Sequence, residues 1–170
     1  MITSTAVCEA IAGRIAQLWP DRYLYRDACP ANFERPSGFL YMTKSEVTPS
    51  GPQQVDCLVE AQLELFCRTD AYDITSTEEL RRDQEQVLLH FGGRKIQVGN
   101  RWLTLTAQGD GMEVGSAFVV FSATWRDQRP GSHDPADPND PVSAAIPKME
   151  DFEWEINSAG QKIKNRKDEV

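Results

Sequence analysis

Hydrophobic and polar residues alternate along residues 55–68, VDCLVEAQLELFCR. Side chains of a β-strand point alternately to opposite faces, so the pattern predicts a long strand with one face on a core and the other mostly in water. The core-facing positions are Cys57, Val59, Ala61, Leu63, Leu65 and Cys67. The opposite positions are polar except for Leu58 and Phe66. We expect the rest of the chain to pair with this strand or to pack on it.

Two segments repeat apolar residues every three or four positions, which is typical of amphipathic helices. The first runs from an N-cap at Thr3 or Ser4 to Trp19 and is stopped by Pro20. The second follows two overlapping capping boxes, Thr75 with Glu78 and Ser76 with Glu79, and ends at the glycines of residues 92–93. We expect this second helix to turn Leu80, Val87, Leu88 and Phe91 inward and Asp83, Glu85 and Gln86 outward.

Shorter apolar or alternating stretches predict strands at residues 38–44, 95–98, 102–107 and 117–125, and residues 22–26 are a candidate for a short edge strand. A loop of roughly ten residues is expected between the second and third strands, and a hairpin turn at residues 109–111, Gly-Asp-Gly. Consecutive strands joined by short turns are antiparallel. The sequence therefore predicts an α+β two-layer sandwich, with a mainly antiparallel sheet of about four to five strands and two helices on one face.

The sheet face away from the helices mixes apolar and charged residues. Phe66, Phe118 and Val120 share it with Glu60, Gln62 and Glu64. Two interpretations are open: the face is a contact surface for another protein, or the sheet curls and partly covers itself.

The composition changes near residue 128. Residues 1–128 form the predicted domain, and residues 129–170 form an acidic, Pro/Asp-rich arm that carries too few large apolar residues to fold by itself. Within the arm, residues 151–156 alternate, with Phe152, Trp154 and Ile156 on one face. This predicts a strand without a partner nearby, which either returns to its own sheet edge or docks on another subunit by strand addition. Residues 162–170 are charged and expected to fray.

The charge and the cysteines narrow the class of protein. A formal net charge of −8 argues against a protein that grips nucleic-acid phosphates, which requires clustered Lys and Arg. The four cysteines, Cys8, Cys29, Cys57 and Cys67, form no CxxC pair. We expect buried, reduced thiols in a protein made in a cytosol. No stretch approaches the roughly 20 apolar residues of a membrane span, so no membrane association is expected.

No group of residues in the sequence has the pattern of a catalytic, cofactor or metal site. His90 is expected to be a helix C-terminal residue favoured by the helix dipole. His133 is followed by Asp134, Asp137 and Asp140, but an extended chain with this spacing does not converge its oxygens on one cation. The glycine clusters match no phosphate-binding loop. We therefore expect no enzyme activity, no cofactor and no metal.

The order of the elements and several short strings resemble the tail terminator (tail completion) proteins of long-tailed bacteriophages, especially those of phages and prophages of Gram-positive bacteria. The strings are Leu18-Trp19-Pro20, Tyr23-Leu-Tyr25, SGFLYM after Arg35-Pro36, Leu-Phe-Cys ending the long strand, Ala71-Tyr72 before the capped helix, and Ala123-Thr-Trp125-Arg126. The resemblance covers roughly residues 2–127. It does not include the acidic arm or the strand at residues 151–156.

The resemblance implies a structural virion protein at the head-proximal end of the tail, assembled in the bacterial host cytoplasm. Such proteins form a ring, usually a homohexamer, that ends polymerisation of the tail tube protein and meets the neck or head-completion protein. DNA passes through the lumen without specific binding. An acidic body suits such a channel, because like charge avoids retention of phosphates.

Residues at polar hairpin tips, on the mixed sheet face and in the arm are candidates for subunit or tail-tube contact. They are Glu46, Ser50, Gln53, Phe66, Asp110, Phe118, Phe152 and Trp154. Two alternatives stay open. One is a neck, head-closure or other tail component, and the other is a non-phage α+β module that binds a small molecule.

Overall fold

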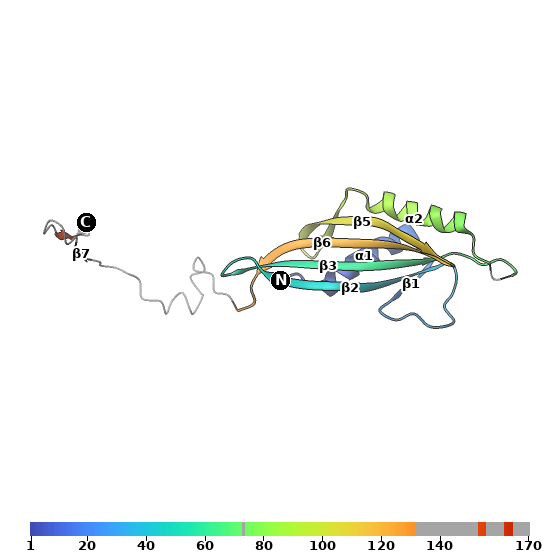
Figure 1. Ribbon diagram of the computed structural model, residues 1–170, viewed down its shortest axis with the longest axis horizontal. Coiled ribbons are helices and arrows are strands. Elements are labelled where there is room, and N and C mark those ends of the chain that lie inside the picture. The colour runs from blue at the N-terminus through green and yellow to red at the C-terminus, as the bar shows by residue number, and fades with distance from the viewer. Residues whose placement is uncertain (73, 132–152, 156–161, 165–170) are drawn as a thin grey trace. The chain divides into compact units, whose positions relative to one another are not determined.

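The computed structural model describes residues 1–72, 74–131, 153–155 and 162–164 (Figure 1). The chain divides into two compact units, Met1–Pro130 and Gly131–Val170. The first unit is an α+β domain with two helices and one curled sheet of six strands. Neither of its helices is long and apolar enough to cross a membrane.

The two helices begin at capping residues that the sequence identifies. Helix α1 spans Ser4–Leu18, and the Thr3 side chain accepts a hydrogen bond from the Ala6 N–H at 3.2 Å. Helix α2 spans Thr77–Phe91, and the Ser76 hydroxyl accepts from the Glu79 N–H at 3.3 Å. The structure thus uses the second of the two overlapping capping boxes. As expected, α2 ends before the glycines at residues 92–93.

The expected outward position of Asp83 is wrong. Asp83 is buried on the inner side of α2, where it forms an ion pair with Arg22 at 2.6 Å. Its inward neighbours Leu80, Val87 and Phe91 are buried as expected. A carboxylate tolerates this position because the guanidinium supplies two hydrogen bonds to it.

The sheet has the strand order β1-β2-β3-β6-β5-β4. Its strands are β1 (Tyr23–Arg26), β2 (Ser37–Pro49), β3 (Gln54–Phe66), β4 (Lys95–Val98), β5 (Arg101–Glu113) and β6 (Ser116–Gln128). The strand pattern at residues 55–68 corresponds to β3, which pairs with β2 on one side and with β6 on the other. All pairings are antiparallel except that of β1 with β2. The count exceeds the expected four to five because both short edge strands pair.

Two expected loops are strands in the structure. Strand β2 continues to Pro49, so the connection to β3 is only the short turn of residues 50–53 rather than a long loop. Strand β5 runs through residues 109–111 with a register irregularity between Gly109 and Met112, and the hairpin turns instead at residues 114–115. Gly115 takes a φ of +95°, a conformation that glycine adopts without strain. In both places pairing with a neighbouring strand overrides the local turn signal.

The core lies between the helices and one face of the sheet. Cys57, Val59, Ala61, Leu63 and Leu65 of β3 are buried there, as the alternation predicts. So are the corresponding residues of β6, from Ala117 to Trp125. Phe91 of α2 contacts Phe121 of β6 with ring centres 4.8 Å apart. This burial fixes which sheet face points away from the helices.

The second unit contains a short hairpin. Strand β7 (Glu153–Glu155) pairs antiparallel with β8 (Lys162–Lys164), with Trp154 opposite Ile163. The expectation of a strand without a nearby partner is therefore wrong. The expectation that residues 162–170 fray is likewise wrong at Lys162–Lys164, where a single apolar residue between two lysines gives no strand signal. Phe152, Ile156, His133 and the aspartates that follow His133 lie outside the described residues.

Candidate interaction surface

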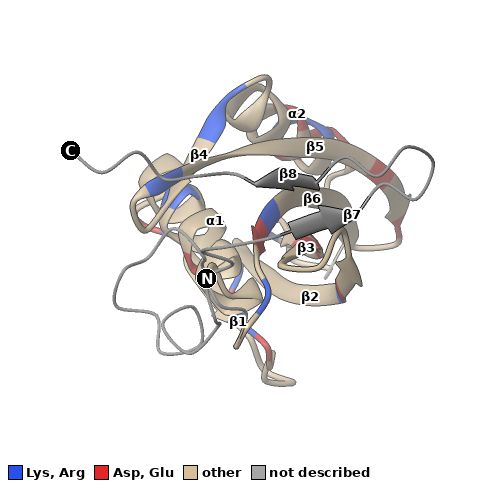
Figure 2. Ribbon diagram, turned by 90° about the vertical axis from the view of Figure 1, so that its left-hand side faces the viewer, with Lys and Arg blue, Asp and Glu red and all other residues tan. Residues whose placement is uncertain are grey.

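The sheet face away from the helices, here called the open face, is half covered. Its residues on the two central strands are only partly exposed: Leu58, Glu60, Gln62 and Glu64 on β3, and Phe118, Val120 and Ser122 on β6. Figure 2 views the curled sheet along its strands and shows α1 and α2 with it. The open face thus combines apolar and acidic side chains that are partly exposed.

One end of the open face is aromatic and acidic. Phe39 and Tyr41 of β2 lie with ring centres 4.8 Å apart. The pKa of Tyr41 is raised, first by burial and then by the charges of Glu64 and Glu113. Glu113 belongs to β5 and Tyr41 to β2, two strands that are not neighbours in the sheet.

Phe66 ends the apolar series on this face and is already covered by its own chain. Its ring lies 4.3 Å from that of Phe33, and the Arg35 guanidinium lies 4.8 Å and 5.3 Å from the centres of the Phe33 and Phe66 rings. Phe66 keeps only 8% of its surface exposed. It therefore offers little area to another protein.

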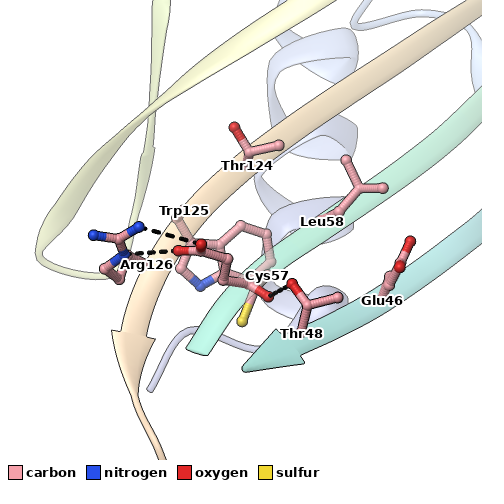
Figure 3. Close-up of a pocket in the computed structure, with 8 residues that line it drawn as sticks. Glu46, Thr48, Cys57, Leu58, Thr124, Trp125 and Arg126 are labelled. Atoms are coloured by element: carbon pink, nitrogen blue, oxygen red, sulfur yellow. Dashed lines mark hydrogen bonds and ion pairs between the residues drawn. The ribbon is translucent and has the colours of Figure 1, made fainter. Parts of the chain in front are cut away.

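The other end of the open face holds a shallow depression of about 560 Å³ (Figure 3). Arg126 and Asp56 form a bidentate ion pair there, with Nε to Oδ1 at 2.7 Å and Nη2 to Oδ2 at 3.2 Å. The hydrogen bond from Arg126 is the main cause of a lowered Asp56 pKa, and Asp56 in turn raises the pKa of Arg126. Thr48 and Glu46 line the β2 side. The depression thus presents polar groups whose charges are partly satisfied by one another.

The structure brings three of the predicted contact residues together. Glu46 lies at the depression, and Ser50 is in the adjoining β2–β3 turn, where its N–H donates to the Gln54 carbonyl at 3.1 Å. Gln53 is in the same β2–β3 turn, where its carbonyl accepts from the Arg129 N–H at 2.8 Å. These residues form one polar end of the sheet.

The other predicted contact residues are separate from this end. Asp110 is exposed on β5, and its carbonyl accepts from the Gln84 side chain at 3.0 Å. Phe118 is half-buried on the open face, opposite Glu64. Trp154 is in β7, and Phe152 lies outside the described residues.

Several apolar residues that are not among the predicted contact residues are exposed. Tyr72, Ile74, Leu89, Trp102 and Val114 all have most of their side-chain surface in water. The only sequence signal for their exposure is that they lie in or near loops rich in polar residues. Ile74 and Val114 line a further depression.

Within residues 1–72 and 74–131, no group of three or more His, Cys, Asp or Glu side chains is arranged to hold a metal ion. His90 is in the last turn of α2, but burial and then Arg14 and Arg94 lower its pKa, which favours the neutral ring over the expected dipole-stabilised cation.

The sequence matches none of the known protein-family models and none of the curated proteins with which it was compared.

Proposed function

We propose that this protein is a tail terminator of a long-tailed bacteriophage. It forms a ring, most simply a hexamer, at the head-proximal end of the tail. The ring ends polymerisation of the tube, joins the tail to the neck and lets DNA pass. The resemblance of residues 2–127 to that family suggests this function, and features of the domain support it.

The mixed chemistry of the open face carries the proposal. Phe39, Tyr41, Phe118 and Val120 place apolar area beside Glu60 and Glu64 on a sheet face that neither helix covers. A contiguous surface of this kind is more typical of a protein contact than of a surface built only for water. A subunit that must bind a neighbour and a tube needs such a surface.

The edge of β2 offers a second type of contact. Strand β1 pairs with β2 only from Ser37 to Leu40. In the described part of the chain, residues 41–49 of β2 pair with β3 alone, and those from Met42 to Pro49 are all exposed. An unpaired edge can accept a strand from another subunit. This feature supports an assembled protein over a solitary one.

The alternatives receive less support. A module for small molecules would be expected to have an enclosed and mostly apolar pocket. The depression around Asp56 and Arg126 is open, and its centre is an ion pair. A neck or head-closure protein would use similar contact surfaces, so only its binding partner distinguishes it from a terminator.

Electron microscopy of assembled tubes tests the proposal. The purified chain is mixed with the tail tube protein of the same genome during tube growth. We expect shorter tubes with a ring at one end, and weaker capping by Val120→Asp, which places a charge on the open face. Leu89→Asp, an exposed position on α2, is the matched control and should cap normally. Tubes of unchanged length without a terminal ring would overturn the proposal, and binding to a neck protein instead would favour the head-closure alternative.

A further inference from the structure

Two loops at one end of the sheet hold apolar side chains in water. Ile74, in the segment between β3 and α2, is 64% exposed, and Val114, in the β5–β6 turn, is fully exposed. Thr75 packs beside Gly115, so the two loops are adjacent. With the half-buried Met112, Ile74 and Val114 line a depression of about 470 Å³, here called the apolar depression.

Hydrogen bonds hold the first of these loops in place. The Asp70 carboxylate accepts from the N–H groups of Tyr72 and Ile74 at 2.8 and 2.9 Å. The Asp70 N–H donates to the Ile74 carbonyl at 3.0 Å, and Thr69 forms an isolated bridge with Thr75. The exposed position of Ile74 is therefore part of the folded structure. A fixed apolar group in water is typical of a docking surface.

The one charged residue that lines the apolar depression is acidic, Glu113. Asp70, Glu78 and Glu79 follow or precede its lining residues by a few positions, and Arg81 and Arg82 follow them on α2 without lining it. A partner that fits this surface has a large apolar side chain with basic groups around it.

The opposite end of the same sheet has such a surface, centred on Trp102. The indole is 62% exposed, and Lys95 lies on the same sheet face because it pairs with Thr104 two residues further along β5. Arg101 is the preceding residue, and its guanidinium donates to the Arg126 carbonyl at 2.9 Å. Arg101 forms an ion pair with Asp127, and Arg126 forms one with Asp56. The positive charge of this surface is therefore supplied by Lys95.

The two surfaces lie at opposite ends of the strands. In the β3–β6 ladder, Leu65 pairs with Ala117 beside the apolar depression, whereas Asp56 pairs with Arg126 near Trp102. Nine residues of strand separate these pairs, roughly 30 Å at 3.3 Å per residue. One copy therefore cannot join its own two surfaces.

We propose that copies of this chain join head to tail, with Trp102 of one copy seated in the apolar depression of the next. This inference rests on the proposed ring, and it names the contact that builds it. Trp is enriched at the energetic centres of interfaces, and the negative charge of Glu113 at the apolar depression complements the positive charge of Lys95 beside Trp102. A contact between two different surfaces is heterologous, and it closes into a ring when the rotation between neighbours permits.

Mixing two variants of the full chain tests this contact. Val114→Asp disables only the apolar depression and Trp102→Asp disables only the indole surface; both positions are exposed, so the fold should survive. We expect light scattering to give an oligomer for the unmodified chain and a monomer for each variant alone. The equimolar mixture should give a species of twice the monomer mass, because one productive contact remains between the two variants. Leu89→Asp should keep the full oligomer.

Other outcomes overturn the contact. The proposed contact is wrong if the unmodified chain stays monomeric both at the highest concentration reached and on tubes. It is also wrong if either variant alone still forms the oligomer. A mixture that stays monomeric would show that the two surfaces do not meet. Circular dichroism of each variant checks the fold, and Ile74→Asp replaces Val114→Asp if that variant is unfolded. Failure of the tail function would look different: rings sensitive to both substitutions would form, while tubes would grow unchecked beside them.

Discussion

Arg22 and Asp83 form a bidentate ion pair that joins α2 to the segment between α1 and β1. The distances are 2.6 Å from Nη1 to Oδ2 and 3.3 Å from Nη2 to Oδ1. The Asp83 side chain is 3% exposed, and the Arg22 guanidinium lies 4.3 Å from the centre of the Trp19 ring. Trp19 in turn donates from its indole N–H to Gln86 at 3.3 Å. Charge, aromatic contact and hydrogen bond together fix α2 against the end of α1.

Removal of one partner of this pair should destabilise the domain strongly. For Asp83→Ala we expect the free energy of unfolding to fall by about 3 kcal/mol, because Arg22 is left partly buried without its counter-ion. Urea unfolding followed by circular dichroism measures the change. Glu85→Ala, on the exposed side of the same helix, is the control and should change stability by no more than about 0.5 kcal/mol.

The double variant Arg22→Met/Asp83→Leu separates the pair from its surroundings. Replacement of both charges by apolar groups should recover part of the loss, since no unpaired charge is then buried. A double variant as unstable as the sum of the single losses would show that the two side chains act independently.

The position of Asp83 in this pair could not be predicted from the sequence. Periodicity places Leu80, Val87 and Phe91 correctly, because apolar residues bury wherever the helix packs. The same reasoning turns Asp83 outward, since the residue that neutralises it is 61 positions away in the sequence. A local pattern carries no information about a distant charge partner.

The hairpins show a second limit. Residues 44–49 are mostly polar, and residues 109–111 contain two glycines, so both stretches favour a loop. Both pair with strands that have strong patterns, β3 and β6, and become strand themselves. β-Structure depends on the neighbour as much as on the segment's own residues.

The candidate surfaces could be predicted only in part. Alternation identified the mixed face that Phe118 and Val120 share with acidic residues of β3. It could not show that Phe33 and Arg35 cover Phe66, because their approach depends on the loop before β2. Nor could it bring Ile74 and Val114 together, since only the tertiary fold makes their loops adjacent.

The Ser76 cap should contribute measurably to stability. Ser76→Ala removes the hydroxyl that accepts from the Glu79 N–H, and we expect a loss of about 1 kcal/mol in the free energy of unfolding. Thermal or urea unfolding checks this value. Thr77→Ala, at the exposed first residue of α2, should have little effect, and an equal loss from both substitutions would argue against the specific role of Ser76.

The ion pair between Asp56 and Arg126 should make stability depend on pH. The folded pKa of Asp56 is lower than its ordinary value, so the unfolded chain binds the proton more readily. The stabilisation is therefore present above the ordinary Asp pKa of about 3.9 and is lost as the pH falls through the lower folded value. Asp56→Asn should flatten the pH dependence of unfolding between about pH 5 and pH 2.

The Asp56→Asn variant should retain some of this dependence. The Asp127 pKa is raised by burial, but hydrogen bonds from the backbone N–H groups of Ile2 and Gln128 outweigh that effect and lower it overall. Glu85→Gln is the control for loss of a charge without an ion pair. An Asp56→Asn curve parallel to that of the unmodified chain would contradict the role of the pair.

The four thiols should differ in their reactivity. Burial raises the pKa of all four thiols, and for Cys29 the charge of Glu64 adds to this effect. Cys8, Cys57 and Cys67 are buried as expected, whereas Cys29 is partly exposed in a loop, so the expected burial is wrong for Cys29. We expect one rapid reaction with a thiol reagent under native conditions and three slow ones that await unfolding. Cys29→Ser should abolish the rapid phase. A rapid phase that survives this substitution would show that a buried thiol is reached through local opening.

Removal of residues 131–170 should leave the domain folded. Every core residue of the sheet and helices lies within Met1–Pro130. The truncated chain also keeps the hydrogen bond from the Arg129 N–H to the Gln53 carbonyl, which holds the end of the domain to the β2–β3 turn. We therefore expect a soluble chain with an unchanged circular dichroism spectrum and a cooperative melting transition.

Light scattering of the truncated chain then shows whether the second unit takes part in subunit contact. A smaller oligomer than that of the full chain would place the β7–β8 unit in subunit contact, as an arm that ties neighbours together would require. An oligomer with the same number of subunits would locate the ring contacts entirely within the first unit, and loss of soluble protein would contradict the independence of the domain.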